Sequence, residues 1–321
     1  MNSLTQQKKK YIYLFWLALV IYLGIRLIAL EQFPIYFFSD EAVQTVRAAD
    51  FLRYTLHSES GELLPAFFKN SYQYNLGVSV YLQIIPTLLL GKHIVVTRAV
   101  SVIVSMLAAI SAGLTIELIF KRHAGWLAIL LLSAMPAWFL HSRTAFETAI
   151  AVSFYCAFWL SYALYRFRDR RYIYLAAIFA ALAFYSYSPA QVVVSLTIVA
   201  FFFNDIRFHW QNRKQLLKVG LLAVVLILPY LRFIWLHPGE FSNHLQLVGS
   251  VWVSDLSIWQ KLITILQEYF RGLNPFYWFF SNSVDLPRHV MKGYGHLWQP
   301  ALPLMAVGLI YCLLHLRSSR H

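Results

Sequence analysis

The chain contains little of what a water-soluble protein uses to build its surface. Only 14 of its 321 residues are acidic, and all charged residues together make up 13% of the sequence. Hydrophobic residues reach 59% and aromatic residues 17%, well above the composition of a soluble domain. We therefore expect an all-α polytopic integral membrane protein, and no stretch is polar enough to predict a separate soluble domain.

Cysteine is almost absent as well. Cys156 and Cys312 are the only two, and both lie inside apolar runs, which argues against a structural disulfide. No Cys-x-x-Cys pair and no cluster of histidine with cysteine predicts a zinc site. The two cysteines do not indicate whether the protein faces an oxidising or a reducing compartment.

Lys and Arg give the chain a net charge of +13. They stand in short clusters at the ends of apolar runs, so they predict membrane topology and no nucleic-acid partner. The first cluster, Lys8-Lys9-Lys10, precedes the apolar run 11–30. A cleaved signal peptide is one alternative, but the run is long and lacks a small-residue cleavage site. It therefore predicts a retained anchor with a cytoplasmic N-terminus.

Basic clusters set the expected path of the chain through the membrane. A bilayer core about 30 Å thick needs roughly 20 apolar residues per helix. With the clusters facing the cytoplasm, about eight spans are expected in a single domain over residues 1–321, both ends inside. Four of these spans are predicted at 126–140, 146–165, 172–187 and 189–203.

The run 76–90 is apolar but too short for a usual span. It contains Gln83 and Pro86, so we predict an interfacial or re-entrant helix. This interpretation leaves two long outer loops, at 31–97 and 237–298. Loops of such length are usually functional, so the chemistry is expected on the outer side of the cell membrane.

Ser39-Asp40-Glu41 sets two carboxylates just beyond the first span. In a chain so poor in acid, a pair at the membrane surface requires an explanation based on charge. Ser39 or Asp40 could cap the amphipathic helix predicted at 38–57, with Glu41 in its first turn. A carboxylate here could also act as a general base, and the two roles can coexist.

Other polar residues of the outer side also have two interpretations. Lys69 is either an interfacial anchor or a phosphate ligand, and Arg98 could be only a charge at the end of a span. Arg143 could extend its side chain to lipid headgroups. Thr144-Ala145-Phe146-Glu147 has the spacing of a capping box, which alone could explain Glu147.

These features follow one another in a distinctive order. An anchor leads to the Ser39-Asp40-Glu41 helix start, a stretch with Lys69, a short apolar helix ending in Leu90-Gly91, Arg98 opening a span, and the outer tip 141–147. This order resembles the GT-C glycosyltransferases of the protein mannosyltransferase and aminoarabinose-transferase type. The resemblance covers about residues 11–213 and rests on the combined order of the motifs.

The resemblance implies an inverting transfer of a sugar from a polyprenyl-phosphate-linked donor to a glycan, lipid or protein acceptor. Asp40 would be the catalytic base, because the acceptor hydroxyl must lose its proton as it attacks the anomeric carbon. Cations near the bilayer interface would hold the lipid phosphate. The residues expected to bind substrate are Glu41, Lys69, Arg98, Arg143, Glu147 and His296.

Some GT-C enzymes hold a divalent cation with an Asp-x-Asp motif, which this chain lacks. We therefore expect no cofactor and no metal site, and a cation shared by Asp40 and Glu147 is the alternative. The chain is also shorter than many such enzymes. It is expected to be either a compact version or a fragment truncated at its C-terminus.

A function of another class is a transporter or a protein that binds lipid-linked sugar without catalysis. A transporter would need charged groups near mid-membrane or broken helices in repeated halves. Arg26 and Glu117 are the nearest candidates, and both can reach an interface. No internal repeat is visible, so the transferase is preferred, with its sugar and acceptor left open.

Overall fold

The computed structural model describes residues 2–315, which are mostly helical. Two short strands, β1 (Phe68–Asn70) and β2 (Gln73–Leu76), pair as an antiparallel hairpin. The helices are α1 (Asn2–Leu27), α2 (Ser39–Arg53), α3 (Val78–Leu90), α4 (Ile94–Phe120), α5 (Gly125–Ala134), α6 (Pro136–Arg143), α7 (Glu147–Phe167), α8 (Tyr172–Ser186), α9 (Ser188–Asn204), α10 (Ile206–Gln211), α11 (Arg213–Leu236), α12 (Glu240–Leu247), α13 (Ile258–Leu273), α14 (Pro275–Phe279) and α15 (Ala301–His315), with 3₁₀ turns η1 (Val251–Val253) and η2 (Pro287–His289).

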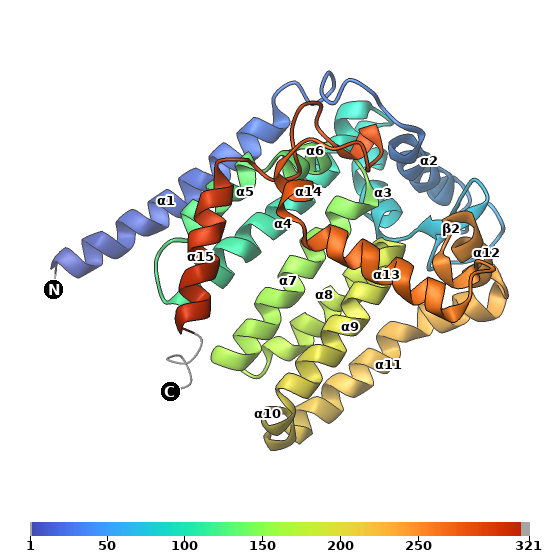
Figure 1. Ribbon diagram of the computed structural model, residues 1–321. Coiled ribbons are helices and arrows are strands. Elements are labelled where there is room, and N and C mark those ends of the chain that lie inside the picture. Colours follow the sequence, from blue (N-terminus) through green and yellow to red (C-terminus); the bar gives the residue numbers. More distant parts are fainter. Residues whose placement is uncertain (1, 316–321) are drawn as a thin grey trace. The chain divides into compact units, whose positions relative to one another are not determined.

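The chain divides into two compact units. The first consists of Met1–Leu132 and His141–Val248, and the second of Ser133–Leu140 and Gly249–His321. Each unit has packing of its own, and the prediction of a single domain stays a prediction. Figure 1 shows the elements along the chain.

Four described helices are long and apolar enough to cross a membrane. They are Lys9–Leu27 within α1, Ile94–Phe120, Glu147–Phe167 and Arg213–Leu236, and the bent pair of α5 and α6 would make a fifth. The shorter α8, α9 and α15 are apolar as well. A helical, polytopic membrane protein is thereby confirmed, while the count of eight spans and their orientation stay predictions.

One predicted span is not a straight helix. The run 126–140 becomes α5 and α6, which meet at an angle of 80°. Pro136 is the first residue of α6, where a proline tolerates its missing N–H but disfavours helical geometry in the preceding residue. The bend therefore follows from Met135-Pro136.

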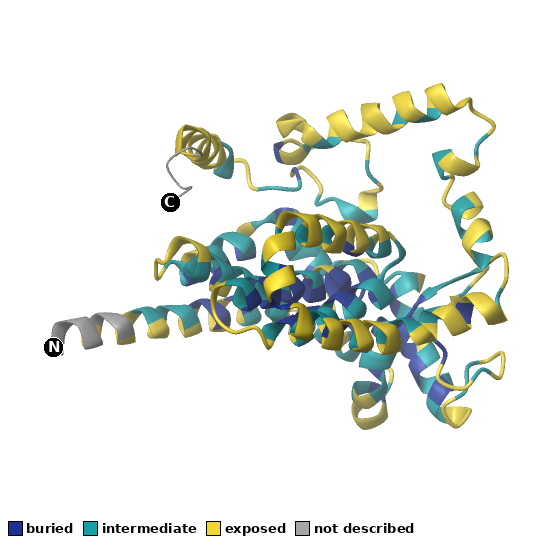
Figure 2. Cartoon of the chain, turned by 90° about the horizontal axis from the view of Figure 1, so that it is seen from below, coloured by how far each residue is buried: buried dark blue, intermediate teal, exposed yellow. Residues whose placement is uncertain are grey.

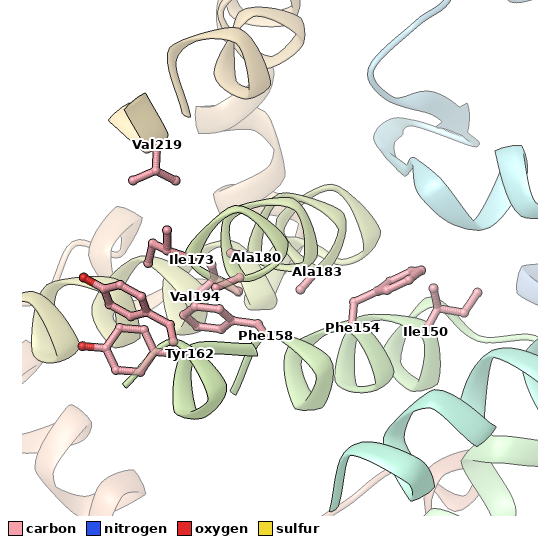
Figure 3. Close-up of a cluster of buried hydrophobic side chains, with 11 residues drawn as sticks. Ile150, Phe154, Phe158, Tyr162, Ile173, Ala180, Ala183, Val194 and Val219 are labelled. Carbon is pink, nitrogen blue, oxygen red and sulfur yellow. The ribbon is translucent and has the colours of Figure 1, made fainter. Parts of the chain in front are cut away.

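Helix α7 lies at the centre of the first unit. It packs against α4 and α8, while α8 also contacts α9 and α11 (Figure 1). Phe154 and Phe158 project from α7 beside Ala180 and Ala183 of α8 (Figure 3). The small alanines let the two helices approach while the rings fill the space between them, as is typical of helix packing in membranes.

The segment that follows α1 has a small core of its own. Ala48 and Phe51 of α2 pack with Phe68 and Leu76 of the hairpin and with Val80 of α3. All five are buried, and Figure 2 shows the buried residues concentrated in the middle of the packed helices. The predicted helix 38–57 is thus confirmed as α2, with a shorter C-terminal end, and 76–90 as the helix α3.

A close backbone approach fixes the start of α3. Gly77 precedes this helix, and a Cβ placed there would lie 2.1 Å from the carbonyl oxygen of Tyr185 at the end of α8. That distance is far below any real contact, so only glycine lets the two backbones meet. Gly77 thus lets the start of α3 lie directly against the end of α8.

Gly77→Ala should lower the free energy of unfolding by about 1–3 kcal/mol, because backbone must move to admit the methyl group. Gly220→Ala is the matched control, since Gly220 lies within α11 with nothing within 4 Å of its added Cβ. Alanine there should be neutral or stabilise by up to ~1 kcal/mol through helix propensity. Thermal unfolding in mild detergent measures both, and equal melting temperatures would contradict the predicted contact.

Candidate functional site

The acid pair lies in the first turn of α2, and neither acid occupies the cap position. The cap position belongs to Phe38, and the predicted capping by Ser39 or Asp40 is not formed. Glu41 instead reaches back, and its Oε1 accepts from the backbone N–H of Phe38 at 3.3 Å. This is the glutamate half of a capping box.

Glu41 also forms a buried ion pair with Arg98 of α4. Arg98 Nε and Nη2 donate to the two carboxylate oxygens of Glu41, at 3.0 and 3.1 Å, and both side chains are fully buried. The backbone N–H of Ala145 donates to Glu41 Oε2 at 2.9 Å. A bidentate pair in this geometry fixes α2 to α4 and to the segment before α7.

The rest of the Arg98 guanidinium binds the backbone between α1 and α2. Nη1 donates to the carbonyl oxygens of Leu30 and Pro34, at 3.0 and 2.9 Å, and more weakly to that of Glu31 at 3.4 Å. Nη2 donates to Tyr36 O at 2.7 Å. Arg98 therefore holds in place the irregular segment that leads into Asp40.

Arg143 does the same for the end of α1. Nη1 donates to the carbonyls of Ile25 and Arg26, and Nη2 to those of Ile28, Ala29 and Phe33, over 2.8–3.2 Å. The last carbonyls of a helix have no partner within it and favour a cation. Arg143 is almost fully buried and caps α1, so it does not extend to lipid headgroups.

These positions bear on the predicted ligands of the lipid phosphate. Arg98 and Arg143 are occupied by Glu41 and by backbone carbonyls, and neither offers an exposed surface. Substrate contact at Glu41, Arg98 and Arg143 stays a prediction, and their observed contacts are structural. Together they shape the loop from which Asp40 extends.

Asp40 is half-buried at the outer edge of this arrangement. Asn70 of β1 donates from Nδ2 to Asp40 Oδ1 at a distance of 3.5 Å. Gln44, one turn along α2, donates to the carbonyl oxygen of Asp40 at 3.2 Å and also to that of Ala145. The predicted base thus has a fixed backbone and a carboxylate within reach of the hairpin.

A hollow of about 370 Å³ lies next to Arg47 of α2 and Lys69 of β1, and Asp40 is not part of its lining. Arg47, which lines it, follows Asp40 by seven residues, or about 10 Å along one face of the helix. Lys69 is exposed in the hollow and, within residues 2–315, its ammonium makes no hydrogen bond or ion pair. The full lining is Arg47, Ser58, Glu59, Ser60, Phe68, Lys69, Ser71 and Tyr74.

Glu147 begins α7 and is buried. Phe146 occupies the cap position, so Glu147 is the first residue of the helix rather than the third. The capping box predicted for Thr144 and Glu147 is therefore not formed, and Thr144 Oγ1 donates instead to His141 O at 3.1 Å. An acid in the first turn still favours the helix N-terminus.

His296 belongs to the second unit. Its Nε2 lies 2.9 Å from Asp285 Oδ2, and Tyr277 donates its hydroxyl to Asp285 Oδ1 at 3.1 Å. Burial and this hydrogen bond raise the pKa of Tyr277, so the phenol stays protonated as the donor. Substrate contact by His296 stays a prediction.

No group of three or more His, Cys, Asp or Glu side chains that could hold a metal ion occurs in the described part of the chain. The expectation of metal-independent chemistry is not decided by this finding. A cation shared by Asp40 and Glu147 likewise stays an alternative.

Three residues near the predicted base were not singled out from the sequence. Asn70 contacts the carboxylate, Gln44 ties α2 to the outer tip, and Arg47 lines the hollow. Helical spacing could have indicated Gln44 and Arg47, which stand four and seven residues after Asp40. Asn70 carried no such signal, because the hairpin turn decides which of its residues faces α2.

Comparison with known proteins gives one family. Residues 78–235 match the model of the dolichyl-phosphate-mannose-protein mannosyltransferase family. The match runs from α3 to the end of α11, just under half of the chain, and includes Arg98, Arg143 and Glu147 but not Asp40. It supports a glycosyltransferase similar to the mannosyltransferases and does not single out the aminoarabinose-transferase type. No curated protein and no solved structure matches the chain significantly.

Arg98→Met should reduce the free energy of unfolding by about 3–5 kcal/mol, because it leaves the Glu41 carboxylate buried without its partner. Glu41→Gln should also destabilise, because each Glu41 oxygen accepts from two N–H groups and the amide NH2 would face two of these donors. Arg53→Met at the exposed end of α2 is the control, expected to stay within about 0.5 kcal/mol of the parent. Denaturant unfolding in mild detergent measures all three, and equal stability of Arg98→Met and Arg53→Met would contradict the structural role of the pair.

Proposed function

We propose that this protein is a membrane glycosyltransferase that transfers a sugar from a polyprenyl-phosphate-linked donor to a hydroxyl-bearing acceptor at the outer face of the membrane. The family match supports the transferase class and, by its description, a lipid-phosphate-linked mannose as the first donor to test. The helical membrane architecture fits a substrate that is itself held in the bilayer.

The observation that carries the proposal is the position of Asp40. Its carboxylate is half-buried in the first turn of α2, after a segment that two buried arginines hold in place. It accepts from Asn70, whose neighbour Lys69 lines a hollow large enough for a sugar ring. A base that removes a proton in the transition state must be held in place before the reaction. The buried Glu41 lacks such access, so Asp40 is the base and Glu41 a positioning residue.

The proposed reaction is a single inverting displacement. Asp40 accepts the proton of the acceptor hydroxyl as the hydroxyl oxygen forms a bond to the anomeric carbon. The bond from that carbon to the phosphate oxygen breaks on the opposite side, and the electron pair leaves with the lipid phosphate. Lys69, the exposed cation of the hollow, is placed to stabilise the anionic leaving group.

Asp40→Asn should lower the rate of sugar transfer by about 10²- to 10⁴-fold, because an amide cannot accept the proton. Asp50→Asn, which changes an acid farther along the same helix, should retain activity. The assay uses purified protein in nanodiscs with polyprenyl-phosphate mannose and follows release of the lipid phosphate. Melting temperatures confirm that both variants are folded.

Equal turnover by Asp40→Asn and the parent would contradict the proposal that Asp40 is the catalytic base. A different result would replace the transferase hypothesis by the transporter hypothesis. In that result the parent consumes none of several polyprenyl-phosphate sugars, while vesicles containing it move solute or lipid. Arg26, one of the two charges considered for a transporter, is fully buried and donates to Ser142 Oγ at 2.7 Å. This contact gives the transporter no specific support.

The outward orientation makes a separate prediction. Ser60→Cys in the hollow should react with a membrane-impermeant maleimide in intact cells, whereas Arg170→Cys, between α7 and α8, should react only after the membrane is opened. Both positions are exposed, so a difference in labelling reports the side of the membrane. The reverse pattern would place Asp40 in the cytoplasm and contradict the proposed site of transfer.

A further inference from the structure

Helix α13 separates its apolar and polar residues completely. At ~100° per residue, the apolar side chains occupy one arc of about 160°. They are Ile258, Trp259, Leu262, Ile263, Ile265, Leu266, Tyr269, Phe270 and Leu273. The opposite side carries Gln260, Lys261, Thr264, Gln267, Glu268 and Arg271.

The helix is well formed at its start and along its polar side. Ser257 and Gln260 form a capping box, in which Ser257 N donates to Gln260 Oε1 at 2.9 Å. Arg271 pairs with Glu268 at 2.9 Å, and Lys261 donates to the carbonyl oxygen of Trp252 at 3.0 Å. The charged side chains on the polar side of α13 are thus paired with one another or with a backbone carbonyl.

The apolar side is exposed along its whole length. Within residues 2–315, no residue of α13 is buried, and Trp259 and Phe270 are 76% and 65% exposed (Figure 2). Each large apolar side chain gains about 1.5–3 kcal/mol when removed from water. A continuous face of nine such residues requires a cover.

Another helix of the same unit indicates what covers the apolar face of α13. Helix α15 is apolar on all sides and exposed, with Leu304, Met305, Val307 and Leu313 pointing in different directions around its axis. A helix that is apolar all round requires hydrocarbon. The lipid that surrounds α15 is therefore available to α13.

We propose that α13 is an interfacial helix that lies in the membrane surface, with its apolar face in the boundary between headgroups and acyl chains. One-sided amphipathicity is typical of helices that lie on a bilayer rather than cross it. Trp259 and Tyr269 are of the types enriched at this depth. Lys261, Arg271 and Glu268 sum to a charge of +1, so apolar burial holds the helix and anionic lipid is not required.

This placement has a consequence for the second unit. Trp278, just beyond α13, donates from Nε1 to the carbonyl oxygen of Gly272 at 2.5 Å. Tyr277, Asp285 and His296 follow in the hydrogen-bonded group described above. A surface-bound α13 would fix the depth of that group near the headgroups. The proposal does not depend on the transferase assignment.

The experiment measures the surroundings of nitroxide labels in nanodiscs of zwitterionic phosphatidylcholine. In a background with Cys156→Ala and Cys312→Ala, single cysteines replace Leu266 or Leu262 on the apolar side and Thr264 on the opposite side. The labels at the two leucine positions should be relaxed mainly by oxygen, which concentrates in lipid. The label at Thr264→Cys should be relaxed mainly by a water-soluble nickel chelate, and added phosphatidylglycerol should change neither result.

Three outcomes would overturn the proposal. Strong relaxation by nickel at all three positions places the helix in water. Protection of Leu266→Cys and Leu262→Cys from both reagents shows a protein cover, and magnetic coupling between labels of two molecules identifies a second copy as that cover. Two apolar positions are used so that misfolding of one variant, revealed by its melting temperature, leaves the other to decide.

Discussion

The first unit depends on two buried guanidinium groups that satisfy a stretch of backbone with no regular structure. Between α1 and α2 the chain turns repeatedly and forms neither a regular helix nor a strand. Arg98 and Arg143 donate to nine carbonyls between them, and Arg98 also to Glu41. Because buried carbonyls without donors are costly, this irregular path exists only with the two arginines in place.

The proposed chemistry depends indirectly on the backbone contacts of Arg98 and Arg143. Asp40 extends from the first turn of a helix whose start is fixed by Glu41, and Glu41 is fixed by Arg98. A carboxylate in the first turn of a helix that follows an irregular segment thus gains a defined position while it stays half-buried. Of the two acids, Glu41 holds the start of the helix, and Asp40 presents its carboxylate to Asn70 of the hairpin.

Much of the fold follows from local patterns in the sequence. Apolar runs became helices, the short run with Gln83 and Pro86 became α3, and Gly91 ends it. The 80° bend before Pro136 was not foreseen, because a proline indicates a break without giving its angle. The roles of Arg98 and Arg143 were missed for another reason.

The sequence does not distinguish an arginine at the end of an apolar run that binds phosphate from one that binds lipid headgroups or backbone carbonyls. The carbonyl partners of Arg98 and Arg143 lie 62 to 118 residues earlier in the chain. No periodicity links such distant positions. Every residue has a backbone carbonyl, so the sequence does not indicate which carbonyls accept from an arginine. Asp40 could be singled out because acid is scarce, whereas cations are common at every membrane boundary.

The order of these partners along the chain also affects how the protein is made. The carbonyls between α1 and α2 are synthesised first, Arg98 follows about sixty residues later, and Arg143 more than a hundred after the end of α1. Synthesis proceeds from the N-terminus, so this loop cannot be completed when it leaves the ribosome. It must wait until α4 and α6 are inserted. The site of Asp40 is therefore assembled late, although its residues are among the first to be made.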